Sequence, residues 1–271
     1  MERRKKFLDE LWSHYRVHGR HDLPWRVPDS DGTLNPYHIL VSEIMLQQTQ
    51  VSRVIPKYEI FLKRFPTVRQ LAEAPLGEVL ISWQGLGYNR RAKFLWQAAQ
   101  ITLRDYDGEL PDDSEALEGL PGIGRNTAGA IRAYAFNQPT LFIETNIRTA
   151  YIHHFFHDQQ GVPDRSIMEL LSQTLDRTNP REFYWALMDY GSYLKQTVGN
   201  LCRASRAYAR QPKFHGSLRQ IRGQVLRMLA TGQLSEGELS QRITDDRLEA
   251  VLDALEREGL INRSQGYYHL P

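Results

Sequence analysis

Most hydrophobic positions along this chain recur three or four residues apart, and alternating spacing is confined to the last dozen residues. The pattern predicts a mainly α-helical protein. A first amphipathic helix covers residues 2–18, and Asn35 followed by proline marks the start of a second, which ends near Leu46. Thr49 is expected to cap the next helix, which ends near Phe65. Further helices are predicted over residues 67–73, 76–83, 89–105, 114–119, 125–136, 146–157, 164–175 and 180–195.

The pattern changes after these helices. Residues 196–215 have little periodicity and many Arg and Lys residues, as in an irregular linker. From Ser217 onward three helices are followed by two short strands around Gln265-Gly266, an order that resembles a winged helix. The third of these helices, over residues 245–258, carries six acidic and two basic residues. Because phosphates would repel it, a docking or stabilising role is favoured over base readout.

Composition narrows the classes of protein further. The 271 residues are 41% apolar and 24% charged, which is ordinary for a soluble globular protein. No apolar run approaches the length of a membrane span, and the basic start is not followed by a signal core, so a cytoplasmic location (nucleoid-associated in a prokaryote) is expected. The net charge of +2 divides into −1 for residues 216–271 and +3 for the rest, so a nucleic-acid contact belongs to the larger part.

One carboxylate, Glu43, lies within the apolar run from Leu40 to Met45 and is followed by two glutamines. A charged side chain among apolar neighbours costs free energy unless it is paired, protonated or faces a cleft. Helical spacing alone leaves two interpretations open, a solvent-exposed helix side and an acid in an apolar wall.

The segment Leu120-Pro121-Gly122-Ile123-Gly124 joins two short predicted helices. Such a turn leaves backbone N–H groups at a helix N-terminus where a phosphate can approach, and the helix dipole favours the anion. The segment resembles a helix-hairpin-helix, a sequence-independent grip on the DNA backbone.

A second carboxylate, Glu144, follows an apolar extended segment, and Thr145 or Asn146 can cap the next helix. A carboxylate at a helix N-terminus is stabilised as an anion. We therefore expect a raised pKa for Glu43 and a lowered pKa for Glu144. Two carboxyls divided into a proton donor and an anion suit hydrolysis of a glycosidic bond, because the transition state carries oxocarbenium charge.

Taken together, residues 23–195 resemble the helix-hairpin-helix (HhH-GPD) base-excision DNA glycosylase superfamily, and most closely its MutY-type adenine glycosylase branch. The matching segments are Leu23 to Arg26, Leu40 to Val51, Trp83 to Tyr88, Leu120 to Ala130 and Glu144 to Asn146. The resemblance implies an all-α, two-lobed fold. Its expected parts are a six-helix barrel over residues 23–136 with the helix-hairpin-helix at 114–130, a helical domain from 1–22 and 137–215, and a winged-helix-like domain at 216–271.

The resemblance also implies residue roles. Glu43 protonates the expelled base, Glu144 stabilises the oxocarbenium or positions water, and Asn146 supports the sugar region. Gln47, Gln48 and Tyr88, here termed the strand-probing residues, enter the base stack. The implied base pocket contains Arg26, Leu46, Val51, Asn126, Trp185 and Met188. The other implied DNA contacts are Thr49, Arg90, Arg91, Gly122, Gly124, Arg125 and Thr127.

Three residues depart from the family pattern. Glu144 stands where the family has Asp, which lengthens the arm by one methylene. Asn126 stands where the bifunctional lyases have Lys, so no Schiff base can form and hydrolysis without strand cleavage is expected. Trp185 stands where the adenine branch has an amide or acid. It either reshapes the base pocket or packs in the core, and both interpretations stay open.

The metal and cofactor sites of the family are not expected here. The four positions that carry iron–sulfur ligands in the family correspond to Lys195, Cys202, Ser205 and Gln211, and one thiolate cannot hold a [4Fe–4S] cluster. Packing is expected to fix this loop instead, with no cofactor. His153, His154 and His157 lie at helical spacings, but no family feature matches them and no metal site is expected.

The expected function is that of a monomeric, monofunctional DNA glycosylase acting on duplex DNA with a mispaired or damaged base. Adenine opposite guanine or 8-oxoguanine is the first expectation. Thymine or uracil opposite guanine is the alternative, because residues 216–271 replace the domain that recognises 8-oxoguanine in the adenine branch. A non-catalytic lesion binder or DNA-bound regulator is a further alternative, against which the retention of Glu43 and Asn146 argues.

Overall fold

The computed structural model describes residues 2–30, 32–210 and 213–271, and the chain divides into two compact units. The first unit holds Met1–Leu40, Asp112–Gly119 and Ile123–Arg210. The second holds Val41–Pro111, Leu120–Gly122 and Gln211–Pro271. Each unit is described by itself below. The division into a barrel, a helical domain and a winged-helix-like domain cuts the chain at other positions and stays a prediction.

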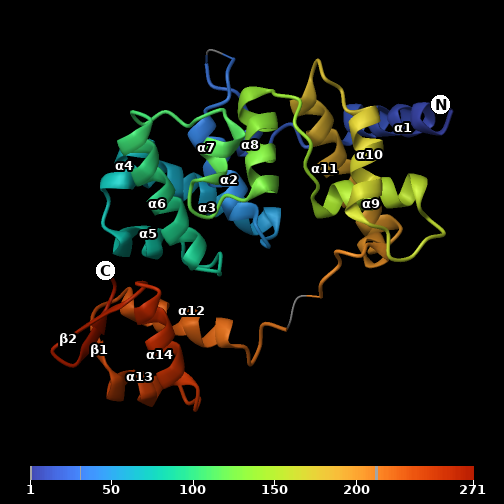
Figure 1. Ribbon diagram of the computed structural model, residues 1–271. Helices are drawn as coiled ribbons and strands as arrows, with labels where there is room; N and C mark the ends of the chain where they lie inside the picture. The colour runs from blue at the N-terminus through green and yellow to red at the C-terminus, as the bar shows by residue number, and fades with distance from the viewer. Residues whose placement is uncertain (1, 31, 211–212) are drawn as a thin grey trace. The chain divides into compact units, whose positions relative to one another are not determined.

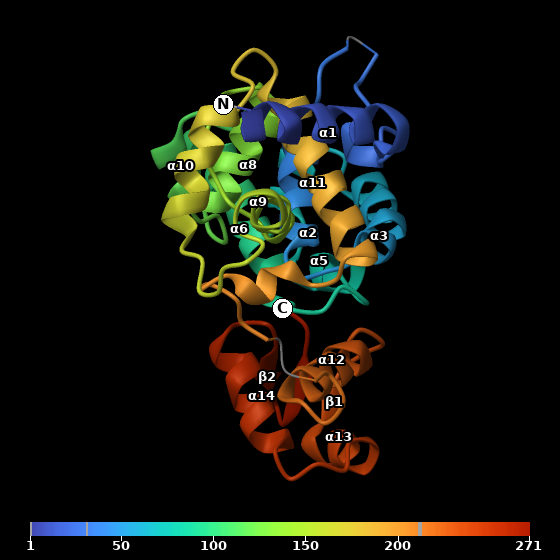
Figure 2. The ribbon, with the colours of Figure 1, turned by 90° about the vertical axis from the view of Figure 1, so that its right-hand side faces the viewer.

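In the first unit the long helix α11 packs against α9, α1 and α8 (Figure 1). The view turned by 90° shows α1 across one end of α11 and α9 beside it (Figure 2). Fully buried aromatic side chains form its core, and the rings of Phe142 and Tyr184 stack at 4.2 Å. The elements of this unit are α1 (Glu2–His18), η1 (Pro24–Arg26), the first half of α2 (Pro36–Leu46), α7 (Ser114–Glu118), α8 (Arg125–Phe136), α9 (Thr145–Phe155), α10 (Asp164–Thr174), α11 (Pro180–Thr197) and η2 (Leu201–Ala204).

In the second unit α6 is the central helix, with α4 and α5 packed against it (Figure 1). Trp83 and Phe61 are fully buried and meet edge to face, with ring centroids 5.9 Å apart. The elements before the linker are the second half of α2, α3 (Val51–Arg64), α4 (Val68–Glu73), α5 (Leu76–Ser82) and α6 (Arg90–Asp105). The elements after it are α12 (Leu218–Leu229), β1 (Leu234–Ser235), α13 (Glu236–Arg242), α14 (Leu248–Arg257), β2 (Asn262–Ser264) and β3 (Tyr267–His269).

Residues 216–271, the C-terminal module, have the helix and strand order of a winged helix. The module consists of three helices and an antiparallel three-stranded sheet of order β1-β3-β2. The predicted hairpin is confirmed, because Gln265 and Gly266 both have the positive φ of a two-residue turn, 50° and 83°. The sequence pattern missed β1, since a two-residue strand has no periodicity to detect.

The mainly helical class is confirmed, and the predicted helices are all present, with ends that differ by at most three residues. Asn35 caps α2 as predicted, accepting a hydrogen bond from the Tyr37 N–H at 3.0 Å. The prediction for Thr49 was wrong, because Gln50 is the N-cap of α3 and the Thr49 hydroxyl donates to the Gln47 carbonyl instead. Throughout the described ranges, none of the helices has the length and apolar character needed to cross a membrane.

Candidate active site and DNA-facing elements

The helix α2 places Glu43 in an apolar setting. The residues at 39–42, 44 and 45 are almost fully buried, and Glu43 is the half-buried exception among them. A helix that is buried on nearly all sides has no solvent-exposed face to hold a surface charge. The structure therefore favours the interpretation of Glu43 as an acid in an apolar wall.

Arg91 of α6 holds the end of this helix in place. Its buried guanidinium donates to the carbonyls of Ile44, Met45 and Gln47 at 2.8, 2.9 and 2.6 Å. These carbonyls belong to the helix C-terminus, where no intrahelical donor is available.

The same guanidinium also reaches the loop before α6 and Thr49, two residues before the start of α3. It donates to the carbonyls of Leu86 and Gly87 at 3.2 and 3.0 Å, and to the Thr49 hydroxyl at 3.0 Å. Burial lowers the pKa of Arg91 to about 10. The predicted DNA contact at Arg91 is corrected accordingly, because its two terminal nitrogens donate to acceptors within the protein and only 8% of the residue is exposed. Thr49 is part of the same structural network.

Two of the strand-probing residues have an unusual backbone conformation. Gln48 and Tyr88 have φ values of +55° and +48°, in the left-handed region that non-glycine residues rarely adopt. Such strained residues persist where the surrounding structure holds them, and they cluster at functional sites. Gln48 is exposed and Gln47 is half-buried, with its amide donating to the Gly122 carbonyl at 3.4 Å. Arg91 thus donates hydrogen bonds to the residues that directly precede Gln48 and Tyr88, the two strained positions.

The predicted helix-hairpin-helix turn is built as such turns require. Gly122 has φ +80°, and a Cβ there would lie 2.8 Å from the Cβ of Phe94, so only glycine fits. Gly124 is the exposed N-cap of α8, and Arg125 is exposed at its first position. Thr127 in the same first turn is half-buried. The start of α8 therefore offers exposed backbone N–H groups beside a cation.

Glu144 is the N-cap residue of α9, but its side chain makes no capping hydrogen bond. The expected cap by Thr145 or Asn146 was wrong, since α9 already begins at Thr145. Burial raises the pKa of the Glu144 carboxyl, and the Arg148 charge opposes this effect. The expected lowering of its pKa was therefore wrong, because the effect of burial is larger than that of the Arg148 charge.

Arg148 is itself engaged elsewhere. Its guanidinium makes two hydrogen bonds to Asp164, at 2.8 and 2.6 Å, so its charge is shared with a second carboxylate. Asn146, in the first turn of α9, is half-buried. Gly191 of α11 permits this position, because a Cβ on Gly191 would lie 2.1 Å from the carbonyl oxygen of Asn146. The close contact between α11 and α9 fixes where Glu144 and Asn146 lie in the first unit.

Asn126 lies near the segment that leads to Glu144. Its side-chain oxygen accepts a hydrogen bond from the Ile143 N–H at 3.4 Å. Gly129, one turn later in α8, has no room for a Cβ, which would lie 2.8 Å from the Cβ of Phe142. The start of α8 and the extended segment 140–143 are therefore held together within the first unit.

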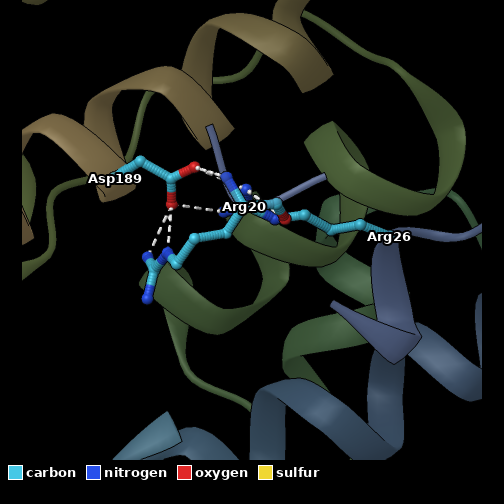
Figure 3. A network of polar contacts seen from close by, with 3 residues as sticks. All are labelled: Arg20, Arg26 and Asp189. Carbon is cyan, nitrogen blue, oxygen red and sulfur yellow. Dashed lines mark hydrogen bonds and ion pairs between the residues drawn. The ribbon is translucent and has the colours of Figure 1, made fainter. Parts of the chain in front are cut away.

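Arg26, one of the predicted base-pocket residues, belongs to a buried ion network with Arg20 and Asp189 (Figure 3). Arg26 makes two hydrogen bonds to Asp189, at 2.8 and 3.0 Å, and only 4% of its side chain is exposed. Arg20 binds the same carboxylate through its backbone N–H at 2.8 Å and its Nε at 2.7 Å. Burial by itself would raise the pKa of Asp189, but the two guanidinium groups hold it below its usual range. Arg26 is thus engaged with Asp189 and also lines a cavity of about 360 Å³ together with Trp185, so its assignment to the base pocket stays a prediction.

Trp185 lies beside this network. It is 8% exposed, its ring stacks on Tyr134 with centroids 6.2 Å apart, and the Arg26 guanidinium lies 5.1 Å from its centroid. Trp185 thus packs against the core and also lines the same cavity as Arg26, so both interpretations stay open. Met188, one turn later in α11, is half-buried, as are Leu46 and Val51 in the second unit.

The loop that carries the iron–sulfur ligands in the family does not fit a cluster here. Cys202 is buried, its thiol donates to the Thr145 carbonyl at 3.0 Å, and burial raises its pKa, which favours the protonated thiol over a ligating thiolate. Lys195 is exposed and Ser205 is buried, and neither side chain is a cluster ligand. Gln211 lies outside the described residues.

Backbone pairing fixes this loop instead. Residues 162 and 205 form a parallel bridge, with hydrogen bonds from Val162 to Ala204 at 2.8 Å and from Arg206 to Val162 at 3.0 Å. The predicted fixation of the loop by packing has its physical basis in this bridge and in the buried Cys202.

Sequence reasoning missed Asp189 and the role of Arg91. Asp189 carried a usable signal, since it is a lone carboxylate in an apolar helical run, as Glu43 is. Arg91 had no such signal, because its acceptors are backbone carbonyls of other segments.

Known proteins resemble this chain in sequence and in structure. Residues 41–176 match the family described as HhH-GPD superfamily base excision DNA repair protein. The adenine DNA glycosylase of Mycolicibacterium smegmatis is 33% identical over 94% of this chain and 92% of its own length. This chain belongs to the HhH-GPD superfamily of base excision DNA repair proteins. The predicted family resemblance is confirmed.

Two further relatives place the chain within the superfamily. The adenine DNA glycosylase of Buchnera aphidicola subsp. Baizongia pistaciae is 36% identical over 69% of this chain, which spans about half (52%) of that protein. The solved structure of a thermostable thymine-DNA glycosylase matches 74% of this chain and 91% of its own, with 25% identity and a TM-score of 0.62. The fold of this HhH-GPD protein is thus that of a DNA glycosylase.

Proposed function

We propose that this protein is an adenine DNA glycosylase, which hydrolyses the N-glycosidic bond of adenine opposite guanine or 8-oxoguanine in duplex DNA. The observation that carries the proposal is the identity with the Mycolicibacterium adenine DNA glycosylase across 94% of the chain. An alignment of that extent includes most of residues 216–271. The C-terminal module therefore has a counterpart in a relative of that activity.

Glu43 is proposed as the general acid. The departing base carries developing negative charge and leaves faster when a proton is supplied to it. The half-buried carboxyl of Glu43, surrounded by buried positions of α2, has the apolar setting that a proton donor requires.

Glu144 is proposed to act as the anion that stabilises the oxocarbenium or positions water, with Asn146 supporting the sugar region. This role requires the ionised form of a carboxyl whose pKa is raised by burial. Arg148 supplies the opposing charge that favours ionisation. We infer that the rate of excision falls in acid as Glu144 takes up a proton.

The DNA contacts are proposed on both units. The exposed start of α8, with Gly122, Gly124, Arg125 and Thr127, would bind phosphate, and exposed Arg90 would bind the backbone. Gln47, Gln48 and Tyr88 would fill the stack and probe the opposite strand. The proposed base-pocket residues remain Arg26, Leu46, Val51, Asn126, Trp185 and Met188. We propose that the protein acts as a monomer and without an iron–sulfur cluster.

We further propose that the enzyme lacks lyase activity. A lyase of this chemistry needs an amine to form a Schiff base with the sugar, and Asn126 has none. Treatment with borohydride during the reaction tests this directly. The proposal predicts no covalent protein–DNA product and strand breaks only after hot alkali, whereas efficient trapping would contradict it.

A second candidate substrate is thymine opposite guanine. The similarity to the thymine-DNA glycosylase structure, at 25% identity over 74% of the chain, supports it. A panel of duplexes with A, T, U and oxidised bases opposite each partner separates the candidates. Abasic product from adenine opposite guanine or 8-oxoguanine is expected, and product from thymine alone would replace the first proposal with the second.

A further inference from the structure

The ring of Tyr88 is in contact with a residue of the C-terminal module. Arg219 of α12 donates a hydrogen bond from its guanidinium to the Tyr88 hydroxyl, and its Cζ lies 5.1 Å from the Tyr88 ring centroid. The Cζ of Arg91 lies 5.6 Å from the same centroid. Both positions are within the range of cation–π attraction. The phenol is thus held by one arginine from α6 and one from the C-terminal module.

The module is fixed to the α6 region by a second set of contacts centred on Glu258. Its carboxylate accepts two hydrogen bonds from Arg222 of α12, at 3.2 and 2.5 Å, and lies 3.8 Å from the Nε of Arg90. The backbone carbonyl of Glu258 accepts a hydrogen bond from the Lys93 ammonium at 2.5 Å. Gly259 makes room for that ammonium, since a Cβ there would lie 2.7 Å from it.

The last residue of the chain adds a backbone contact. The Gly77 N–H donates to the Pro271 carbonyl at 2.9 Å, and a Cβ on Gly77 would lie 2.7 Å from that oxygen. The module therefore meets α5, α6 and the loop between them through hydrogen bonds at three separate points: Pro271, Glu258 and Arg219. Contacts spread in this way fix an orientation, whereas a single contact would allow rotation.

We propose that Arg219 is a positioning residue for Tyr88, so that the C-terminal module completes the strand-probing site. The inference rests on the proposed function, in which Tyr88 enters the base stack. It assigns the module to the recognition of duplex DNA through its docked α12, without base contacts from the acidic α14.

The physical reason is preorganisation. Tyr88 has φ +48°, a conformation that its surroundings must maintain. A ring whose orientation is already fixed loses less conformational freedom when it enters the DNA, which improves binding without any new contact to the bases. The hydrogen bond sets the tilt of the ring, and the two guanidinium groups limit its rotation.

A double-mutant cycle in the full-length protein tests the proposal. The variants are Arg219→Ala, Tyr88→Phe and the pair, with Arg227→Ala as the matched control, because Arg227 is an exposed arginine of the same helix. The first readout is the Kd for duplex DNA with a tetrahydrofuran abasic site, which requires no excision. The second is the fluorescence of 2-aminopurine beside that site, which reports unstacking.

Arg219→Ala is expected to weaken binding by roughly three- to tenfold and to reduce the unstacking signal, while Arg227→Ala changes both much less. In the Tyr88→Phe background the effect of Arg219→Ala should shrink, because the hydroxyl contact is already lost. Equal effects of the two arginine variants, or additive effects in the cycle, would overturn the proposal. Tighter binding by Arg219→Ala would also overturn it, since it would mean that the module covers Tyr88.

The proposed function and the role of Arg219 can be refuted independently of one another. If the wild-type protein excised no base from any duplex, the adenine proposal would be lost, while the binding cycle on abasic-site DNA would still decide the role of Arg219. Thermal unfolding of each variant confirms that the module is folded in the samples compared.

Discussion

At the scale of single residues, three carboxylates in apolar parts of the chain have different surroundings. Asp189 is held below its usual pKa range by two arginines, Glu144 has a raised pKa with Arg148 nearby, and Glu43 lies half-buried in α2. A carboxylate bound by two guanidinium groups is a structural anion. Its two arginine partners therefore distinguish Asp189 from Glu43 and Glu144, the carboxylates to which we assign catalytic roles.

Glu144→Gln is predicted to stabilise the fold and abolish excision. Burial of the ionised carboxyl costs free energy in the folded state, because the folded pKa is raised above the unfolded value. That cost is present above the folded pKa and disappears as the pH falls through it. The variant should therefore unfold at a higher temperature than the wild type at pH 8, and the difference should shrink towards pH 4. A lower unfolding temperature at pH 8 would contradict the assigned burial.

His154 is predicted to make folding stability depend on pH. Burial, with a smaller contribution from His153, lowers its pKa to about 4, and its Nε2 lies 2.8 Å from the Tyr190 hydroxyl. The unfolded chain takes up a proton near pH 6.5 while the folded protein does not, so stability falls between about pH 6.5 and pH 4. Between pH 7 and pH 5, urea unfolding should show a larger loss of unfolding free energy in the wild type than in His154→Gln. Parallel losses in both proteins would contradict this prediction.

At the scale of elements, Arg91 connects the end of α2 to the loops that carry Gln48 and Tyr88. Arg91→Leu is predicted to destabilise the protein by at least about 3 kcal/mol, because several buried carbonyls lose a charged donor together. Arg91→Lys should recover part of this loss. Arg90→Leu is the matched control, since its exposed ion pair with Glu258 contributes less than about 1 kcal/mol. Urea unfolding measures the free energy of unfolding of all three variants. Equal losses for Arg90→Leu and Arg91→Leu would contradict the stabilising role of the buried Arg91.

Elements were more predictable from the sequence than the contacts between them. The helix at 125–136 was predicted with its observed bounds, because its apolar spacing and flanking glycine are local signals. The cap of α3 was misassigned because Thr49 and Gln50 are adjacent and the hydroxyl of Thr49 has other acceptors. Local patterns fix the existence of a helix better than its terminal residue.

The candidate site was predictable only in part. Gln48, Tyr88 and Gly122 were chosen from motifs, and the structure gives each of them a positive φ. The contacts of Asp189 with Arg26 and of Arg219 with Tyr88 join residues 163 and 131 positions apart. Such pairings depend on the tertiary fold, and neither spacing nor periodicity reports them.

At the scale of the whole molecule, the C-terminal module is the part that sequence reasoning explained least. Its net charge of −1 argues against a general attraction to DNA, in contrast with +3 for the remaining chain. Its observed contacts run through Glu258 and Arg219 to α6 and Tyr88. A docked module of this kind acts on DNA recognition through the residues it holds, which agrees with the predicted docking role of its acidic helix.

The central claim is that Glu43 protonates an adenine expelled from a mispair. Single-turnover excision from an adenine:8-oxoguanine duplex, measured for the wild type and for Glu43→Gln at matched DNA occupancy, tests it most directly. We predict abasic product from the wild type and a loss of at least about 10²-fold in the excision rate of the variant, the range of general acid catalysis, with Kd changed only slightly. Retained excision by Glu43→Gln would contradict the claim.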